Sequence, residues 1–98
     1  MLYAVRFHDR PDRLPVRRQY LQAHIDWLDR HKDVVLVAGS LRPEPDGEPV
    51  GGLWLVEAAG KAEVESLLRT DPFHLHGLRL SHEILCWTKA FPERKVPI

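Results

Sequence analysis

The sequence predicts an α+β domain in which strands and helices follow one another in the order β-α-β-β-α-β. Residues 3–8 alternate apolar and more polar side chains with the period of two that is typical of a strand with one buried face. Apolar residues recur with helical spacing in residues 15–31 and 61–70, and a proline-rich connection joins two apolar runs between these helices. This order, without an internal repeat, indicates a ferredoxin-like fold, in which an antiparallel four-stranded sheet has helices on one face.

The first helix is expected to begin at Pro15 and to end near His31. Proline suits the first turn of a helix, because the N–H group that it lacks would have no partner there. On a helical wheel, one continuous arc is mainly apolar or aromatic, and the opposite side is polar. That arc contains Tyr20, Leu21, His24, Ile25, Trp27, Leu28 and His31. The helical face that packs on the sheet is therefore predicted to contain two histidines, with His24 near its middle.

The remaining strands are predicted from apolar runs. Residues 34–38 are β-branched and aliphatic without a polar interruption, which predicts a central strand covered on both faces and ended by Gly39 and Ser40. Residues 41–50 contain three prolines and are expected to connect this strand to a third one at residues 51–56. A long final strand is expected over residues 78–90. One of its faces would present Leu80, His82, Ile84 and Cys86, and the other Ser81, Leu85 and Trp87.

Composition restricts the class of partner. The chain has 98 residues, enough for one domain, and its 14 Lys and Arg residues balance 14 Asp and Glu residues. No net charge therefore favours nucleic acid or an anionic membrane surface, and a small-molecule ligand is expected. The single cysteine cannot form an internal disulfide, and the sequence starts with a strand-like run instead of a signal peptide or a membrane span. The expected location is the cytoplasm.

A sheet with helices on one face leaves its other face without cover. Trp54, Trp87 or their strand neighbours would then form an exposed apolar patch larger than monomers usually tolerate. Two copies with their sheets back to back, as a symmetric homodimer, would bury this patch. Residues 91–98 are expected to form a C-terminal tail that contacts the partner subunit.

The most informative motif is the break at Asp71 and Pro72. A residue before proline is pushed out of the α region, so the second helix must end at Thr70 or Asp71. An aspartate at such a break can cap the next turn, expected over residues 73–77, or direct its carboxylate at a neighbouring side chain. The second possibility would create a site with His24 on the first helix.

Five short segments, in their order along nearly the whole chain, resemble the YCII-related (YciI-like) family. They are Tyr3-Ala4-Val5, residues 21–28 around His24, Ala38-Gly39-Ser40, Gly51-Gly52 and Asp71-Pro72-Phe73. The resemblance implies a dimeric α/β barrel of the ferredoxin-like type, with a cleft lined by a helix histidine and by the aspartate of the Asp-Pro-Phe motif. Those positions are His24 and Asp71. Most members of the family have no assigned reaction, but a dehydrochlorinase of a chlorinated hydroxyhydroquinone belongs to it, and muconolactone isomerases share the superfamily.

A His–Asp pair would support general acid/base catalysis. A carboxylate bonded to one ring nitrogen fixes the tautomer and holds the other nitrogen toward a substrate proton, so neither a nucleophile nor a cofactor is required. Three further residues are candidates for substrate binding. Ser40 would donate or accept a hydrogen bond, Arg17 would hold a carboxylate, and Phe73 would form an apolar wall.

Each candidate also has a purely structural interpretation. His24 would then be a buried core histidine, and Asp71 a helix cap, a role compatible with the catalytic one. Ser40 would be a turn residue, Arg17 a solvated charge and Phe73 a core residue. A metal site is not expected, because His74 and His76 would face apart and no cysteine or carboxylate cluster completes a ligand set. Cys86 is expected to be an inert buried thiol.

Two classes of function remain from the sequence. The first is a small cofactor-independent enzyme that uses His24 and Asp71 for elimination, isomerisation or hydrolysis of a hydroxylated or lactone-like metabolite. The second is a non-catalytic dimeric module that binds a small molecule or assists a larger enzyme. Contact between the two side chains favours the first class.

Overall fold

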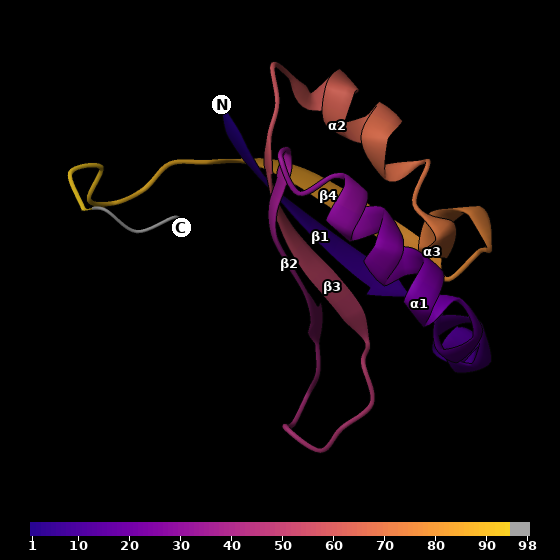
Figure 1. The fold of residues 1–98 in the computed structure, drawn as a ribbon. Helices are drawn as coiled ribbons and strands as arrows, with labels where there is room; N and C mark the ends of the chain where they lie inside the picture. Colours follow the sequence, from indigo (N-terminus) through magenta and orange to yellow (C-terminus); the bar gives the residue numbers. More distant parts are fainter. Residues whose placement is uncertain (95–98) are drawn as a thin grey trace.

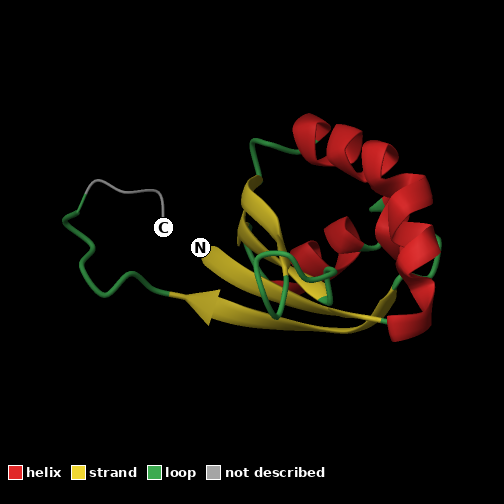
Figure 2. Cartoon of the chain, turned by 90° about the horizontal axis from the view of Figure 1, so that it is seen from below, coloured by secondary structure: helices red, strands yellow, loops and turns green. Residues whose placement is uncertain are grey.

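The computed structural model describes residues 1–94 and confirms the ferredoxin-like fold. The elements are β1 (Leu2–Asp9), the 3-10 helix η1 (Pro11–Arg13), α1 (Leu14–Arg30), β2 (Val35–Leu41), β3 (Gly51–Glu57), α2 (Lys61–Leu68), α3 (Pro72–Leu75) and β4 (Arg79–Trp87). The four strands form one sheet in the order β2-β3-β1-β4, and all neighbours are antiparallel. The helices lie on one face of this sheet, as predicted (Figures 1 and 2).

The core lies between the helices and one face of the two central strands. In β1 the alternate residues Tyr3, Val5 and Phe7 are buried, which confirms the period of two in the sequence. Trp54 of β3 contacts Phe7 edge to face, with ring centroids 4.6 Å apart, and stacks on Trp27 of α1 at 5.2 Å. These aromatic contacts fix α1 over the middle of the sheet.

The predicted central position of the second strand is wrong. β2 is an edge strand, continues through Gly39 and Ser40 to Leu41, and has exposed residues from 36 to 40. An uninterrupted apolar run has no period, so it does not reveal how many neighbours a strand has. Glycine did not end the strand, because the backbone at Gly39 pairs with Leu53 of β3 in the regular ladder.

Three other expectations also differ from the structure. Leu21 and Ile25, at one edge of the predicted helical arc, are exposed, and Cys86 on the edge strand β4 is exposed and not buried. The fourth strand and the second helix are shorter than expected and end at Trp87 and Leu68. Trp87 is exposed, whereas Leu68 is a buried core residue after which the chain turns toward Asp71 and Pro72.

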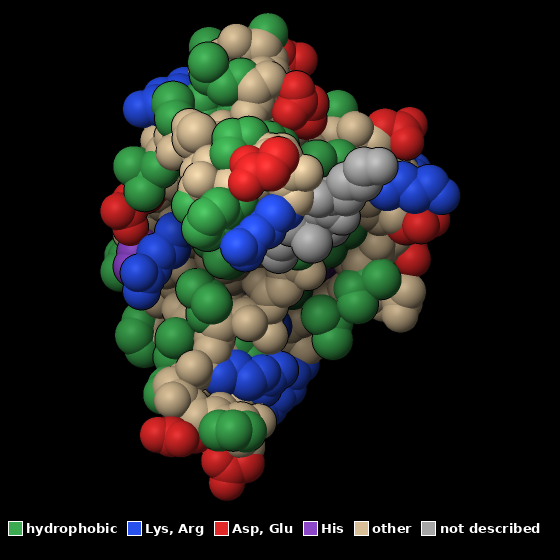
Figure 3. Space-filling model, turned by 90° about the vertical axis from the view of Figure 1, so that its left-hand side faces the viewer, with side chains coloured by type: hydrophobic (Ala, Val, Ile, Leu, Met, Phe, Trp, Pro, Cys, Tyr) green, Lys and Arg blue, Asp and Glu red, His purple; other side chains and the backbone are tan. Residues whose placement is uncertain are grey.

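The open face of the sheet carries exposed apolar side chains from β3 and β4. Leu53, Leu85 and Trp87 are 41%, 54% and 40% exposed, and their cross-strand partners in β1 are the outward-facing even-numbered residues. Figure 3 views the molecule from the left-hand side of Figure 1, and on that side charged side chains of both signs lie among hydrophobic ones. None of the helices within residues 1–94 has the length and apolar character to cross a membrane.

We expect the chain to form a homodimer through this open face at low micromolar concentration, because association would remove the exposed leucine and tryptophan side chains from water. Light scattering measures the mass directly. A monomeric mass in a fully soluble sample would contradict the prediction.

The predicted C-terminal tail is described only in part. Phe91 is half exposed, and Val96 and Ile98 lie outside the described residues, so the contact of the tail with a partner stays a prediction.

Candidate active site

One stripe of α1 contacts the segment between α2 and β4. Trp27 donates a hydrogen bond from Nε1 to Thr70 Oγ1 at 3.0 Å. Two turns earlier on the helix, the ring of Tyr20 stacks on His76 with centroids 3.6 Å apart. His24 lies between these two contacts, at the i, i+4 and i+7 spacing of one helical face. These two side-chain contacts, one on each side of His24 along the helix, therefore hold α1 against the segment that contains the Asp-Pro-Phe motif.

His24 and Asp71 are in direct contact, as the sequence predicted. The distance from His24 Nδ1 to Asp71 Oδ1 is 2.7 Å, and the Asp71 side chain is 1% exposed. Asp71 Oδ1 also accepts a hydrogen bond from the backbone N–H of Phe73 at 3.2 Å, as the N-cap of α3. The capping and pairing roles of Asp71 are therefore both present.

The contact with Asp71 determines which nitrogen of His24 is available. A carboxylate accepts hydrogen bonds, so Nδ1 carries the proton and Nε2 of the neutral ring has a free lone pair. No hydrogen bond from the described residues reaches Nε2. The ring of Phe73 stacks on the imidazole at 3.9 Å and an interplanar angle of 13°, which fixes the ring plane.

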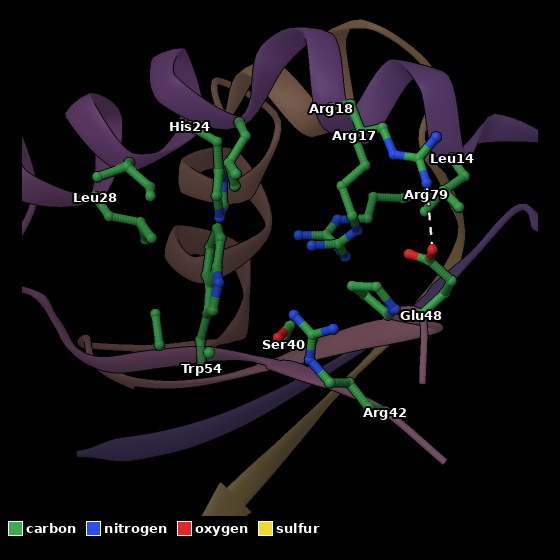
Figure 4. A pocket seen from close by; sticks show the side chains of 16 residues that line it. Leu14, Arg17, Arg18, His24, Leu28, Ser40, Arg42, Glu48, Trp54 and Arg79 are labelled. Atoms are coloured by element: carbon green, nitrogen blue, oxygen red, sulfur yellow. Dashed lines mark hydrogen bonds and ion pairs between the residues drawn. The ribbon is translucent and has the colours of Figure 1, made fainter. Parts of the chain in front are cut away.

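His24 lines a cavity of about 360 Å³ between α1 and the strands β2 and β3 (Figure 4). Ser40 and Arg17 also line it, as two of the predicted substrate-binding residues. Phe73, predicted as an apolar wall, is fully buried behind the imidazole and does not line the cavity. It positions His24 instead. The apolar part of the lining is Leu14, Leu21, Ile25, Leu28, Ala38, Pro49 and Trp54.

Arg17 is not a solvated charge but part of a buried ion-pair cluster beside the cavity. Its Nε and Nη2 atoms donate to Asp9 Oδ2 at 3.2 and 2.5 Å. Arg79 Nη1 donates to the other carboxylate oxygen of Asp9 at 2.8 Å. Arg79 Nη2 also lies 3.9 Å from Asp71 Oδ2, so the cluster continues into the His–Asp pair. Two guanidinium groups thus face two carboxylates.

The Arg79 guanidinium is held in a narrow space. It lies over the ring of Phe7, with 4.2 Å between Cζ and the ring centroid. Burial lowers the pKa of Arg79, and the charge of Asp9 opposes this change. A Cβ atom at Gly52 would lie 3.1 Å from the carbonyl oxygen of Gly39 and 3.6 Å from Arg79 Nη1. The absence of a side chain at Gly52 therefore permits the close approach of the β2 backbone, while an added Cβ would make an ordinary van der Waals contact with Arg79.

Sequence reasoning missed Asp9 and Arg79 as site residues, because a β-bulge redirects one of them. Alternation along β4 places Arg79 with Ser81 on the open face of the sheet. The register between β1 and β4 shifts after His8, so that Asp9 pairs with Arg79 and both side chains turn toward the helices. The sequence carries no evident signal for this shift.

The Asp-Pro-Phe segment contains two further histidines, His74 and His76. Within residues 1–94, no three or more His, Cys, Asp or Glu side chains are grouped so that they could hold a metal ion. The ring of His76 packs on Tyr20, and His76 does not line the cavity.

Comparison with known proteins identifies a family and similar folds. The sequence pattern of the YCII-related domain matches residues 1–88. The chain belongs to the YCII-related family. This YCII-related chain is similar to 5-chloro-2-hydroxyhydroquinone dehydrochlorinase (TftG) from Burkholderia phenoliruptrix AC1100, solved in complex with 2,5-dihydroxybenzoquinone. The two share 29% sequence identity over 90% of this chain and 94% of that one, with a TM-score of 0.81.

A second solved structure supports the fold alone. It is a putative antibiotic biosynthesis monooxygenase from Bacteriodes thetaiotaomicron VPI-5482, which is 24% identical, with a TM-score of 0.58 over 98% of this chain and 94% of that chain. No curated protein shows significant similarity to the sequence.

Proposed function

We propose that this YCII-related domain is a cofactor-independent enzyme that uses His24 and Asp71 for general acid/base chemistry on a small hydroxylated ring compound. One observation carries the proposal: Asp71 holds Nδ1 of His24 while the same imidazole lines a cavity. A cavity of about 360 Å³ is at the lower end of the range for small-molecule sites. The similarity to a dehydrochlorinase of a hydroxyhydroquinone supports elimination as the reaction type.

The proposed chemistry begins at Nε2 of His24. This atom accepts the proton of a ring hydroxyl, and the electron pair of the O–H bond enters the ring. The imidazolium that forms is stabilised by the Asp71 carboxylate at 2.7 Å. In a chlorinated hydroxyhydroquinone, two hydroxyls lose protons, the carbon that bears chlorine gains one, and chloride leaves. The overall change is loss of HCl, and no external oxidant or reductant is needed.

The proposal is tested by anaerobic incubation of the protein with 5-chloro-2-hydroxyhydroquinone and measurement of released chloride. We expect release above the rate of the same protein after heat inactivation. If no chloride appears and muconolactone-type substrates are also unchanged, while 2,5-dihydroxybenzoquinone still binds, the domain is a ligand-binding module and the catalytic proposal fails.

A further inference from the structure

The charged side chains around the cavity leave one cation without a partner. Arg17 and Arg79 face Asp9 and Asp71, and the exposed Arg18 pairs with Glu48 at 3.2 Å. Arg42 also lines the cavity, but within residues 1–94 it forms no ion pair. Its Nη1 atom donates to the carbonyl oxygen of Gly47 at 2.8 Å, which does not neutralise its charge. The cavity therefore has a net charge of one positive unit when His24 is neutral.

This unpaired cation lies at the polar end of the cavity. Arg42 follows directly after β2, and Ser40 precedes it by two residues on the cavity side of the same strand. In Figure 4 the guanidinium of Arg42 lies beside Ser40 and points into the cavity toward the guanidinium groups of Arg17 and Arg79. His24, Leu28 and Trp54 lie at the other end. The cavity thus has one apolar end with a base and one cationic end.

We propose that Arg42 and Ser40 form a subsite for a carboxylate, so that the ligand of this cavity is a hydroxylated cyclic carboxylic acid. A guanidinium binds the planar carboxylate through two parallel N–H donors, and the Ser40 hydroxyl adds a third. One excess positive charge matches a monoanion better than a dianionic phosphate ester. The ring would lie against Leu28 and Trp54, with a hydroxyl directed at His24. The inference rests on the proposed function for the role of His24, but the charge of the ligand is tested separately.

The test uses two ligands that differ only in a carboxylate: 2,5-dihydroxybenzoate and hydroquinone. Binding is followed by quenching of tryptophan fluorescence, since Trp54 lines the cavity, and by calorimetry. We expect 2,5-dihydroxybenzoate to bind at least about tenfold more tightly, because hydrogen bonds between a guanidinium and a carboxylate are stronger than those between neutral groups. Arg42→Gln should remove this difference and leave the affinity for hydroquinone within about twofold.

Arg18→Gln is the matched control, because it removes the same charge at the same cavity from an arginine that already has a carboxylate partner. We expect the preference for the benzoate to persist in this variant. Equal affinity of the parent for both ligands, or an equal loss in the Arg18 and Arg42 variants, would overturn the subsite. Thermal melting verifies that Arg42→Gln, an exposed position, is folded. The affinity measurements test the carboxylate subsite, and chloride release tests the catalytic proposal. Either of the two predictions can therefore fail while the other succeeds.

Discussion

His24→Gln is expected to lower kcat by about 10²–10⁴-fold, the usual contribution of a positioned general base. Glutamine retains a polar side chain of similar reach but cannot accept a proton in the neutral pH range. The measurement is the initial rate of chloride release from 5-chloro-2-hydroxyhydroquinone, with folding verified by thermal melting. His31→Gln on the same helix is the control, since His31 stacks on Trp27 outside the cavity and should keep the parental rate.

Asp71 has two roles, as the cap of α3 and as the partner that orients the His24 imidazole. The substitution Asp71→Asn separates them. An asparagine oxygen still accepts from the Phe73 N–H, so the fold should persist. Its amide group would favour the wrong tautomer of His24, and kcat should fall by about 10²-fold or more. Parental rates in both variants, with parental melting, would show that the pair is structural.

Asp9→Ala should cause the largest loss of stability of any single change in the site. The carboxylate of Asp9 forms ion pairs with both Arg17 and Arg79, and all three side chains are largely buried. Removal of one partner from a buried ion pair costs about 3–5 kcal/mol, because the remaining charge stays desolvated. That cost is a large part of the roughly 5–15 kcal/mol by which a domain is stable. Urea denaturation measures the difference as a shift of the midpoint.

Asp12→Ala provides the control, because Asp12 is exposed in η1 and should change stability by less than about 0.5 kcal/mol. If Asp9→Ala does not fold, Asp9→Asn should give an intermediate loss, since an amide oxygen still accepts from one guanidinium. A parental urea midpoint for either Asp9 variant would contradict the role of the cluster.

The His–Asp pair could be predicted because each half has a local signal. The helical period places His24 on the buried face of α1, and the proline at residue 72 keeps Asp71 in an extended conformation at the start of α3. Helix and strand order then bring the two together. The same local patterns gave the correct fold class, because the period of two in β1 and the two amphipathic helices are independent of tertiary contacts.

The cationic part of the site could not be predicted in this way. Arg79 faces inward only because the register between β1 and β4 shifts at Asp9, and alternation along one strand does not show such a shift. Ser40 and Arg42 lie at the cationic end of the cavity because β2 is an edge strand. That edge position depends on the pairing of β1 with β3. Both features are long-range properties of the sheet, and an apolar run in the sequence does not determine them.

The most direct test of the central claim is a crystal structure of the protein with 2,5-dihydroxybenzoquinone, the ligand found in the similar dehydrochlorinase. We predict that a ring oxygen lies about 2.6–3.2 Å from His24 Nε2, while Nδ1 keeps its contact with Asp71. A ligand bound outside this cavity, or a His24 whose Nε2 is hydrogen-bonded only to protein groups, would contradict the assignment of His24 as the catalytic base.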